Sequence, residues 1–142
     1  MSSPELSIVI PVYNRVEYLK WTLNTVLRAT EGIDFEVIII DDGSTECVES
    51  ILSDYPSTPF KYIHQENAGS CLAKANGFAN CSGKFVHFLD ADDFVHPDKY
   101  KVALRAIGKS DVFVSSEMNL FVNGAGLVTG RTASHQLKAA KP

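Results

Sequence analysis

Two groups of acidic residues stand where apolar runs of the sequence end. Residues 37–40 are followed by Asp-Asp-Gly-Ser, and residues 85–89 are followed by Asp-Ala-Asp-Asp. In the second group a single alanine separates two aspartates, so both carboxylates can approach one centre. Hard cations such as Mg²⁺ bind oxygen ligands and often take only one or two carboxylates, with phosphate oxygens supplying the rest. The Asp-Ala-Asp sequence therefore predicts a site for a metal-bound diphosphate, although surface turns are also rich in aspartate.

Three other residues have types and positions suited to the same ligand. Tyr13 follows the apolar run of residues 6–12, where an aromatic ring can stack on a nucleobase, although packing is the commoner role of a lone tyrosine. Asp42 can accept a hydrogen bond from a base or a ribose. Lys74 follows a glycine-containing loop at residues 67–70, and such a loop at a helix N-terminus suits an anion. Taken alone, this lysine would be an ordinary solvated residue.

The sequence alternates between strand-like and helix-like segments, and this alternation predicts the framework that positions these residues. We expect strands at residues 6–12, 35–40, 60–63, 85–89 and 111–115, and helices at residues 16–30, 45–55, 68–80 and 97–107. Such an order predicts an α/β fold with a mostly parallel sheet and helices on both faces. Ligands of these sheets bind beyond the carboxyl ends of the strands, which is where both acidic groups fall.

The alternating pattern weakens after Glu117. Residues 120–122 and 127–129 flank the sequence Asn-Gly-Ala-Gly and predict a β-hairpin. Residues 131–142 contain no acidic residue and show little periodicity, so we expect a frayed tail there.

Composition and charge narrow the class of protein. The 142 residues are 45% hydrophobic and 21% charged, values typical of a globular domain and not of a disordered chain. The net charge of −4 argues against a nucleic-acid partner. The three cysteines form no CxxC pair, and the sequence shows neither a signal peptide nor an apolar run of membrane-spanning length. We therefore expect a cytoplasmic location, with a longer parent protein able to act at the cytoplasmic face of a membrane.

Taken in order, the motifs resemble the family 2 glycosyltransferases, inverting enzymes of GT-A (Rossmann-like) fold that use nucleotide-diphosphate sugars. The matching segments are residues 7–15, 37–45, 67–69, 83–93 and 97–98. Each motif is weak alone, but together they cover residues 6–116 in the right order and spacing. The resemblance implies that residues 1–116 form a nucleotide-sugar-binding core, and that residues 117–142 begin an acceptor-side region that stops short of completion.

The resemblance also implies roles for single residues. Tyr13 would stack on the donor base, Asp42 would contact the base or its ribose, and Asp90 would contact the ribose or the sugar. Asp92 would hold Mg²⁺ or Mn²⁺ on the diphosphate. Lys74 stands where the family usually has an arginine, and it supplies charge without a bidentate fork. The donor-binding residues that the resemblance implies are Pro11, Tyr13, Asp41, Asp42, Lys74, Asp90 and Ala91.

An inverting transfer needs charge neutralisation of the leaving diphosphate and a base that deprotonates the acceptor hydroxyl. In the resembling enzymes the base is an acidic residue well downstream of the Asp-x-Asp motif, and this sequence has no acidic residue after Glu117. We therefore expect the base beyond Pro142, and a chain that binds the donor but transfers little sugar. The family favours a UDP-sugar as donor and a carbohydrate or lipid-linked hydroxyl as acceptor.

Two other functions fit parts of the pattern. A non-catalytic nucleotide-sugar-binding module would also lack the base. A phosphohydrolase with an aspartyl nucleophile also carries Asp-x-Asp at a strand end, but on an early strand and followed by a small residue such as threonine or valine. Here Asp93 and Phe94 follow the motif, so this alternative is the less favoured one.

Overall fold

The computed structural model describes residues 3–107 and, beyond them, residues 113–114, 120–121, 128–129 and 136–137. The chain divides into two compact units, Met1–Lys99 and Tyr100–Pro142. This division falls earlier than residue 116, where the sequence places the end of a donor-binding core. The assignment of residues 117–142 to an acceptor-side region stays a proposal.

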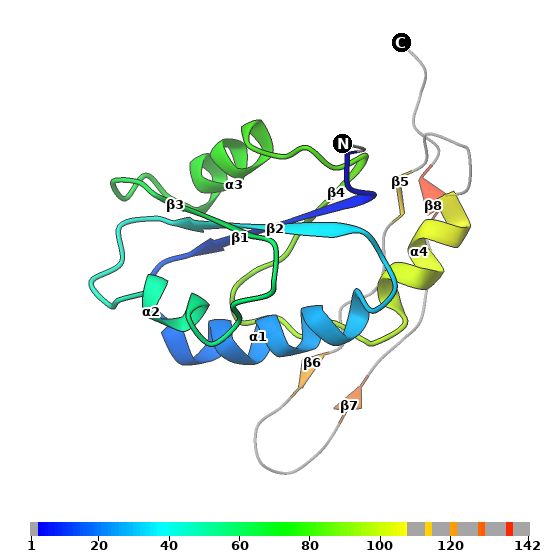
Figure 1. The fold of residues 1–142 in the computed structure, drawn as a ribbon, viewed down its shortest axis with the longest axis horizontal. Coiled ribbons are helices and arrows are strands. Elements are labelled where there is room, and N and C mark those ends of the chain that lie inside the picture. The colour runs from blue at the N-terminus through cyan, green and yellow to red at the C-terminus, as the bar shows by residue number, and fades with distance from the viewer. Residues whose placement is uncertain (1–2, 108–112, 115–119, 122–127, 130–135, 138–142) are drawn as a thin grey trace. The chain divides into compact units, whose positions relative to one another are not determined.

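The first unit is built on a four-stranded parallel sheet, as the sequence predicts. Its strands are arranged in the order β3-β2-β1-β4 (Figure 1), and their bounds are Leu6–Val12 for β1, Phe35–Asp41 for β2, Phe60–His64 for β3 and Phe85–Phe88 for β4. Every residue of β1 is buried, and so are the last five of β2. Nearly continuous apolar runs are typical of strands with both faces covered.

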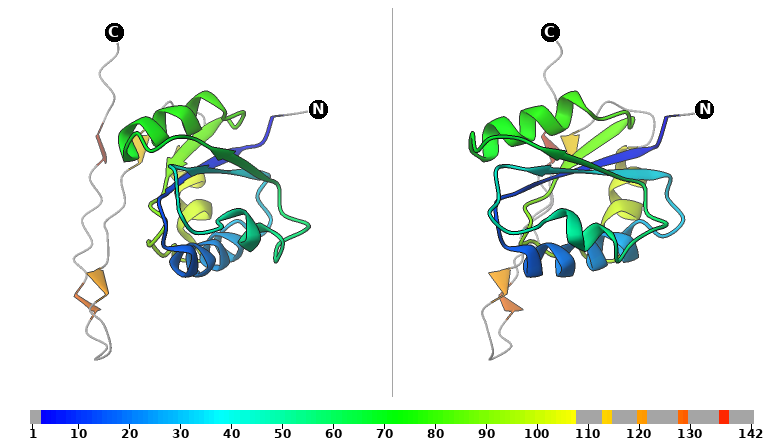
Figure 2. Two further views of the ribbon diagram at one scale, coloured as in Figure 1. Left: turned by 90° about the vertical axis from the view of Figure 1, so that its left-hand side faces the viewer. Right: turned by 60° about the vertical axis from the view of Figure 1, so that its left-hand side comes forward.

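Helices cover both faces of this sheet. Figures 1 and 2 show α3 (Ser70–Ala79) on one face, and α1 (Val16–Ala29) and α2 (Glu49–Leu52) on the other. The apolar stripe of α1 is buried at Leu19, Leu23 and Val26. This arrangement confirms the predicted α/β class, a Rossmann-like sheet between helical layers.

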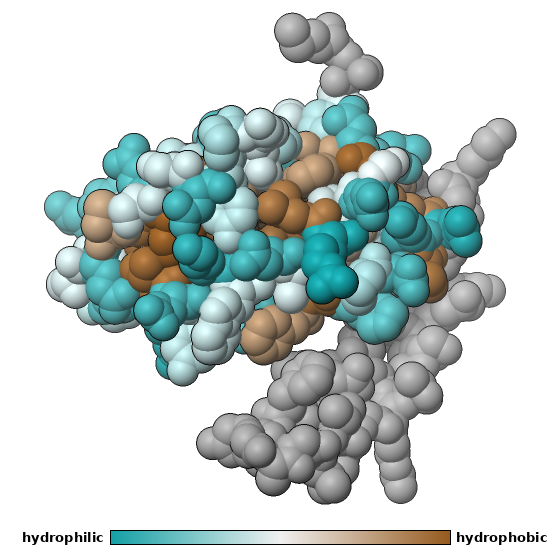
Figure 3. Space-filling model, turned by 60° about the horizontal axis from the view of Figure 1, so that its bottom comes forward, coloured by the Kyte–Doolittle hydropathy of each residue, from teal (hydrophilic) through white to brown (hydrophobic). Residues whose placement is uncertain are grey.

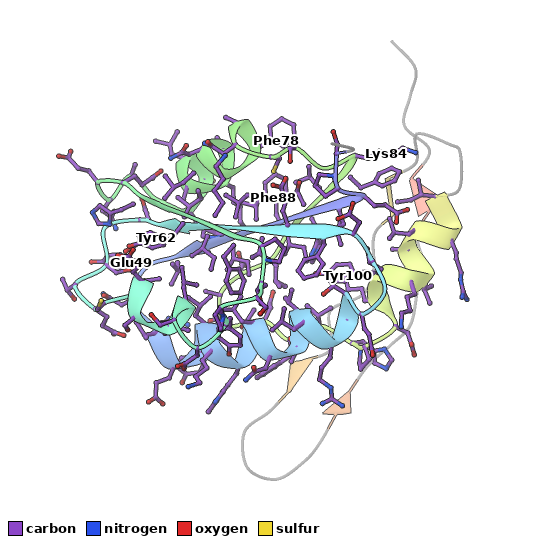
Figure 4. All side chains as sticks on the ribbon, viewed as in Figure 1. Glu49, Tyr62, Phe78, Lys84, Phe88 and Tyr100 are labelled. Carbon is purple, nitrogen blue, oxygen red and sulfur yellow. The ribbon has the colours of Figure 1, made fainter. Side chains whose placement is uncertain are left out.

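Helix α3 packs very closely on the sheet because its buried face consists of small residues. Ala73 is fully buried in a cluster with Val9, Ile38 and Ile40. A Cβ atom on Gly77 would lie 2.3 Å from Cγ1 of Val9, so no larger residue fits there without movement. At the edge of the same layer, Phe78 and Phe88 lie beside each other with ring centroids 6.3 Å apart (Figure 4).

The helix expected over residues 45–55 is much shorter in the structure. Only Glu49–Leu52 is helical, because the residues before it are held in a turn. The side-chain oxygen of Asn14 accepts hydrogen bonds from the backbone nitrogens of Thr45 (2.9 Å) and Glu46 (3.3 Å). These long-range contacts with the end of β1 fix a non-helical turn, which a helical pattern in the sequence does not reveal.

Helix α4 (Lys99–Ile107) begins at the last residue of the first unit, close to its predicted start after Pro97. In the second unit, β6 (Leu120–Phe121) pairs antiparallel with β7 (Val128–Thr129), which confirms the predicted hairpin pairing. A further pair joins β5 (Phe113–Val114), within the strand predicted at residues 111–115, to β8 (Gln136–Leu137). Residues 136–137 thus form a strand inside the segment for which we expected a frayed tail; the rest of that segment lies outside the described residues.

On the side of α1, the surface of the described residues is mainly polar (Figure 3). Figure 3 views the molecule from the side of α1, where teal and white residues predominate and brown residues gather in small groups. Among the described residues, no helix combines the length and the apolar character needed to cross a membrane.

Candidate functional site

A pocket of about 360 Å³ lies at the carboxyl edge of the sheet, formed by the end of β1, the residues that follow β1, β2 and β4, and the start of α3. Because all four strands are parallel, their carboxyl ends lie at one edge, and a ligand site is expected there. The residues that line the pocket are Pro11, Val12, Tyr13, Asn14, Arg15, Asp42, Ser70, Asp90, Ala91 and Asp92. Six of the eight residues predicted from the sequence are among them; Asp41 and Lys74 are not.

Asp42 faces the pocket and also holds the loop that precedes α3. Its side chain is almost fully buried. One carboxylate oxygen accepts hydrogen bonds from Nε2 of Gln65 (2.7 Å) and the backbone nitrogen of Ala68 (2.9 Å). The other oxygen accepts one from the backbone nitrogen of Gly69 (2.9 Å). A carboxylate has roughly four acceptor positions, so one remains for a ligand.

Asp41 has a different environment from its neighbour. It accepts hydrogen bonds from the backbone nitrogen of Ser44 (2.8 Å) and the hydroxyl of Tyr62 (2.7 Å), and it lies 3.3 Å from Nδ1 of His64. Burial alone would raise the pKa of Asp41, but these hydrogen bonds outweigh it and hold the pKa below its usual value. Successive side chains of a strand point to opposite faces, so adjacent aspartates are not both expected to line one pocket. Strand alternation was therefore the signal that could have separated Asp41 from Asp42.

Tyr62, whose hydroxyl donates to Asp41, is the middle residue of β3, and Glu49 lies near it (Figure 4). Burial, together with the hydrogen bond to Asp41, raises the pKa of Tyr62 far above its ordinary value. Tyr62 therefore acts as a hydrogen-bond donor that stabilises the turn after β2.

The Asp-Ala-Asp loop carries two ion pairs with basic residues from other elements. Asp90 pairs with Nζ of Lys74 on α3 at 2.8 Å. Asp92 pairs with Nη1 of Arg15, the residue that precedes α1. Lys74 thus reaches the site through Asp90 although it does not line the pocket.

Two threonines of helix α1 form hydrogen bonds with the backbone of this loop and of the residues that follow it. The hydroxyl of Thr22 donates to the carbonyl oxygen of Ala91 at 2.8 Å, in a buried hydrogen bond. The hydroxyl of Thr25 accepts from the backbone nitrogen of Val95 at 3.1 Å. Sequence reasoning missed both residues, because threonines on the buried side of a helix give no local sign of a distant partner.

The carboxylates of the loop also affect the neighbouring Asp93. Burial raises the pKa of Asp93, and the charges of Asp90 and Asp92 raise it further. Within the residues that the structure describes, no three metal-ligating side chains come together. A hard cation at this loop would have the carboxylates of Asp90 and Asp92 as oxygen ligands and would need the rest of its shell from a bound ligand.

The turn between β1 and α1 brings Tyr13 and Arg15 to the pocket. The Tyr13 side chain is about half exposed, with a relative accessibility of 53%. Asn14 and Arg15 both adopt the left-handed backbone conformation, with φ angles of 56° and 60°. The side chain of Asn14 stabilises this turn through its hydrogen bonds to the segment after β2. The sequence analysis includes both Arg15 and Asp92 in its motifs, but it does not predict that they pair, because they lie 77 residues apart.

The sequence is similar to that of known glycosyltransferases. The sequence model of Glycosyl transferase family 2 matches residues 7–124. An uncharacterized glycosyltransferase of Rickettsia conorii is 32% identical over 127 residues, which make up 89% of this chain and 21% of that protein. The glycosyltransferase GlyA of Streptococcus pneumoniae is 31% identical over 105 residues, 72% of this chain and 15% of that protein. The chain thus spans about a fifth or less of the length of these relatives.

Among solved structures, S. aureus TarS (residues 1–349) in complex with UDP-GlcNAc aligns with a TM-score of 0.73 and 28% identity. The alignment covers 87% of this chain and 36% of that one. The parallel sheet between helical layers is the GT-A arrangement that these proteins share. The family model covers most of the sequence and the fold agrees with it, so this chain belongs to glycosyl transferase family 2.

Proposed function

We propose that the pocket at the carboxyl edge of the sheet binds a nucleotide-diphosphate sugar and serves an inverting glycosyl transfer. The observation that carries this proposal is the convergence of six predicted donor- and metal-binding residues on one pocket. A UDP-sugar is the favoured donor, supported by the UDP-GlcNAc complex of TarS. The alternative of a non-catalytic nucleotide-sugar-binding module differs only in whether transfer follows binding.

In this proposal the exposed ring of Tyr13 stacks on the base, and the free acceptor position of Asp42 receives a hydrogen bond from the base or ribose. Asp42 is well suited to this role because three hydrogen bonds already fix its orientation. Asp90 contacts the ribose or the sugar, and Lys74 brings a positive charge near the diphosphate through its contact with Asp90. The buried position of Asp41 gives it a supporting role in the turn behind Asp42.

Asp92 is the residue that we propose to hold Mg²⁺ or Mn²⁺. Its carboxylate lines the pocket beside Asp90, and its side chain is 41% exposed, so a ligand can reach it. When bound, the cation would neutralise the charge of the departing diphosphate. Thr22 keeps this loop in place by fixing the carbonyl of Ala91.

The acceptor side of the reaction needs a base in line with the departing diphosphate. The described carboxylates that line the pocket are those of Asp42, Asp90 and Asp92, and each already has a role in donor or metal binding. The sequence has no acidic residue after Glu117, so we propose that the base lies beyond Pro142, in the part of the longer relatives that this chain does not span. The acceptor would be a carbohydrate or a lipid-linked hydroxyl.

Calorimetric titration of the protein with UDP and with GDP tests this proposal. Each titration is made with Mn²⁺ and again with EDTA. We expect binding of UDP that requires the metal and exceeds binding of GDP. Absence of binding to both nucleotides in the presence of Mn²⁺ would refute the proposed donor site. UDP release from an added UDP-sugar by this chain would show that it contains its own base, and would contradict the proposal that the base lies outside it.

A further inference from the structure

We propose that Arg15 is a donor-binding residue that exchanges partners during donor binding. Arg15 pairs with Asp92 in the structure, and we infer that it leaves this carboxylate when Asp92 takes a divalent cation. The guanidinium then contacts the diphosphate of the donor. The inference rests on the proposed function and adds to it a residue that couples metal binding to nucleotide binding.

Arg15 lies in the pocket, in contact with the residue proposed to hold the metal. Nη1 of its guanidinium contacts Oδ2 of Asp92, and both residues line the same pocket. A guanidinium and a divalent cation are both positive, so they compete for one carboxylate oxygen. A cation held by Asp92 would therefore repel the guanidinium of Arg15 and weaken its contact with Oδ2.

Hydrogen bonds fix the backbone at Arg15, whereas its side chain stays accessible to solvent. Its carbonyl accepts a hydrogen bond from the backbone nitrogen of Leu19 at 3.1 Å. On one side Asn14 is tied to the segment after β2, and on the other the backbone nitrogen of Val16 donates to Glu46 at 3.1 Å. The side chain of Arg15 is 61% exposed. Its long side chain can therefore turn within the pocket without any change in the fold.

The guanidinium of Arg15 suits a diphosphate better than the single carboxylate of Asp92. An exposed ion pair is a weak interaction, so Asp92 is readily released from Arg15. A guanidinium binds phosphate oxygens through two parallel hydrogen bonds and does so better than an ammonium group. Lys74 can offer only a point charge and is paired with Asp90. Arg15 is thus the pocket residue best suited to a diphosphate.

The variant Arg15→Gln tests this exchange, because glutamine keeps a polar side chain but loses the positive charge. Mn²⁺ binding is measured by electron paramagnetic resonance, first without nucleotide. We expect Mn²⁺ to bind about threefold more tightly to the variant, since the competing ion pair is gone. UDP affinity at saturating Mn²⁺ is expected to fall about tenfold, as for the loss of a charge-assisted hydrogen bond. Affinity for uridine, which lacks phosphates, should not change.

The variant Lys20→Gln is the matched control. Lys20 also belongs to an exposed ion pair, 2.7 Å from Asp54, but neither residue lines the pocket. We expect it to leave Mn²⁺ and UDP affinities unchanged. If wild-type protein binds UDP with Mn²⁺ and Arg15→Gln binds both as wild type does, the exchange is refuted while the donor site stands. If the wild-type protein itself binds neither, the proposed function fails, and the exchange fails with it.

Discussion

The hydrogen bond from Thr22 to Ala91 leads to a sharp prediction, because it joins the core helix α1 to the middle of the Asp-Ala-Asp loop. Substitution of Thr22 by valine keeps the branched shape and a similar helix propensity, and it removes only the hydroxyl. Thr22 is fully buried and Ala91 is 8% exposed, so water cannot easily replace the lost donor. A buried carbonyl left without its donor lowers the free energy of unfolding by about 1–3 kcal/mol.

The effect on function should accompany this loss of stability. Ala91 lies between Asp90 and Asp92, so a shift of its carbonyl displaces the carboxylates on both sides. We expect Thr22→Val to weaken Mn²⁺-dependent UDP binding by about threefold to tenfold, which corresponds to about 0.7–1.4 kcal/mol. Urea unfolding measures the stability, where the midpoint should fall and the slope should not change. Calorimetry measures the affinity.

Thr30→Val provides the control for this experiment. Thr30 is also buried, but its hydroxyl donates to carbonyls of its own helix, those of Val26 (2.9 Å) and Leu27 (3.3 Å). The carbonyl of Val26 keeps a second donor, the backbone nitrogen of Thr30. We expect a smaller loss of stability and no change in UDP affinity. If Thr22→Val matched this control in both measurements, α1 would not position the loop and the reasoning would be refuted.

Two further predictions concern stability. Gly77→Ala should lower the free energy of unfolding by about 1–3 kcal/mol in a urea titration, because the new Cβ would lie 2.3 Å from Cγ1 of Val9; an unchanged midpoint would contradict the close packing of α3. Burial, with a smaller effect of Lys99, lowers the pKa of His87 from 6.5 to about 4, so the folded protein keeps the imidazole neutral while the unfolded chain protonates it. Stability from this group is full above pH 6.5 and is lost as the pH falls toward 4, and we expect about 2 kcal/mol less at pH 5 than at pH 7. His87→Gln should remove this pH dependence, and an equal dependence in both proteins would show that His87 is not its source.

Much of the fold follows from the sequence because local and global preferences agree. The runs that form β1 and β2 are nearly continuously apolar, as burial on both faces requires, and acidic residues follow β2 and β4. The site at the carboxyl edge could therefore be placed before the structure was known. What could not be predicted depends on contacts between distant residues: the turn that Asn14 imposes after β2, the hydrogen bond of Thr22, and the pair of Arg15 with Asp92.

The expected roles of Asp41 and Asp42 illustrate the same limit within the site. Both lie at one strand end and both suit a nucleotide by residue type, so composition and spacing treat them alike. In the structure only Asp42 lines the pocket, whereas Asp41 binds Ser44 and Tyr62. The alternation of side chains along a strand separates the two, and this geometric rule distinguishes them where residue type does not.

In the proposed function, Asp92 binds a divalent cation together with the diphosphate of a nucleotide. Its most direct test compares UDP titrations of Asp92→Asn and Asp54→Asn, each with Mn²⁺ and with EDTA. Asp54 is a fair control because it is also an exposed aspartate in an ion pair, and it lies outside the pocket. We expect Asp54→Asn to bind UDP as the wild type does and Asp92→Asn to lose metal-dependent binding with nearly unchanged stability. Metal-dependent binding of wild-type strength by Asp92→Asn would contradict the claim.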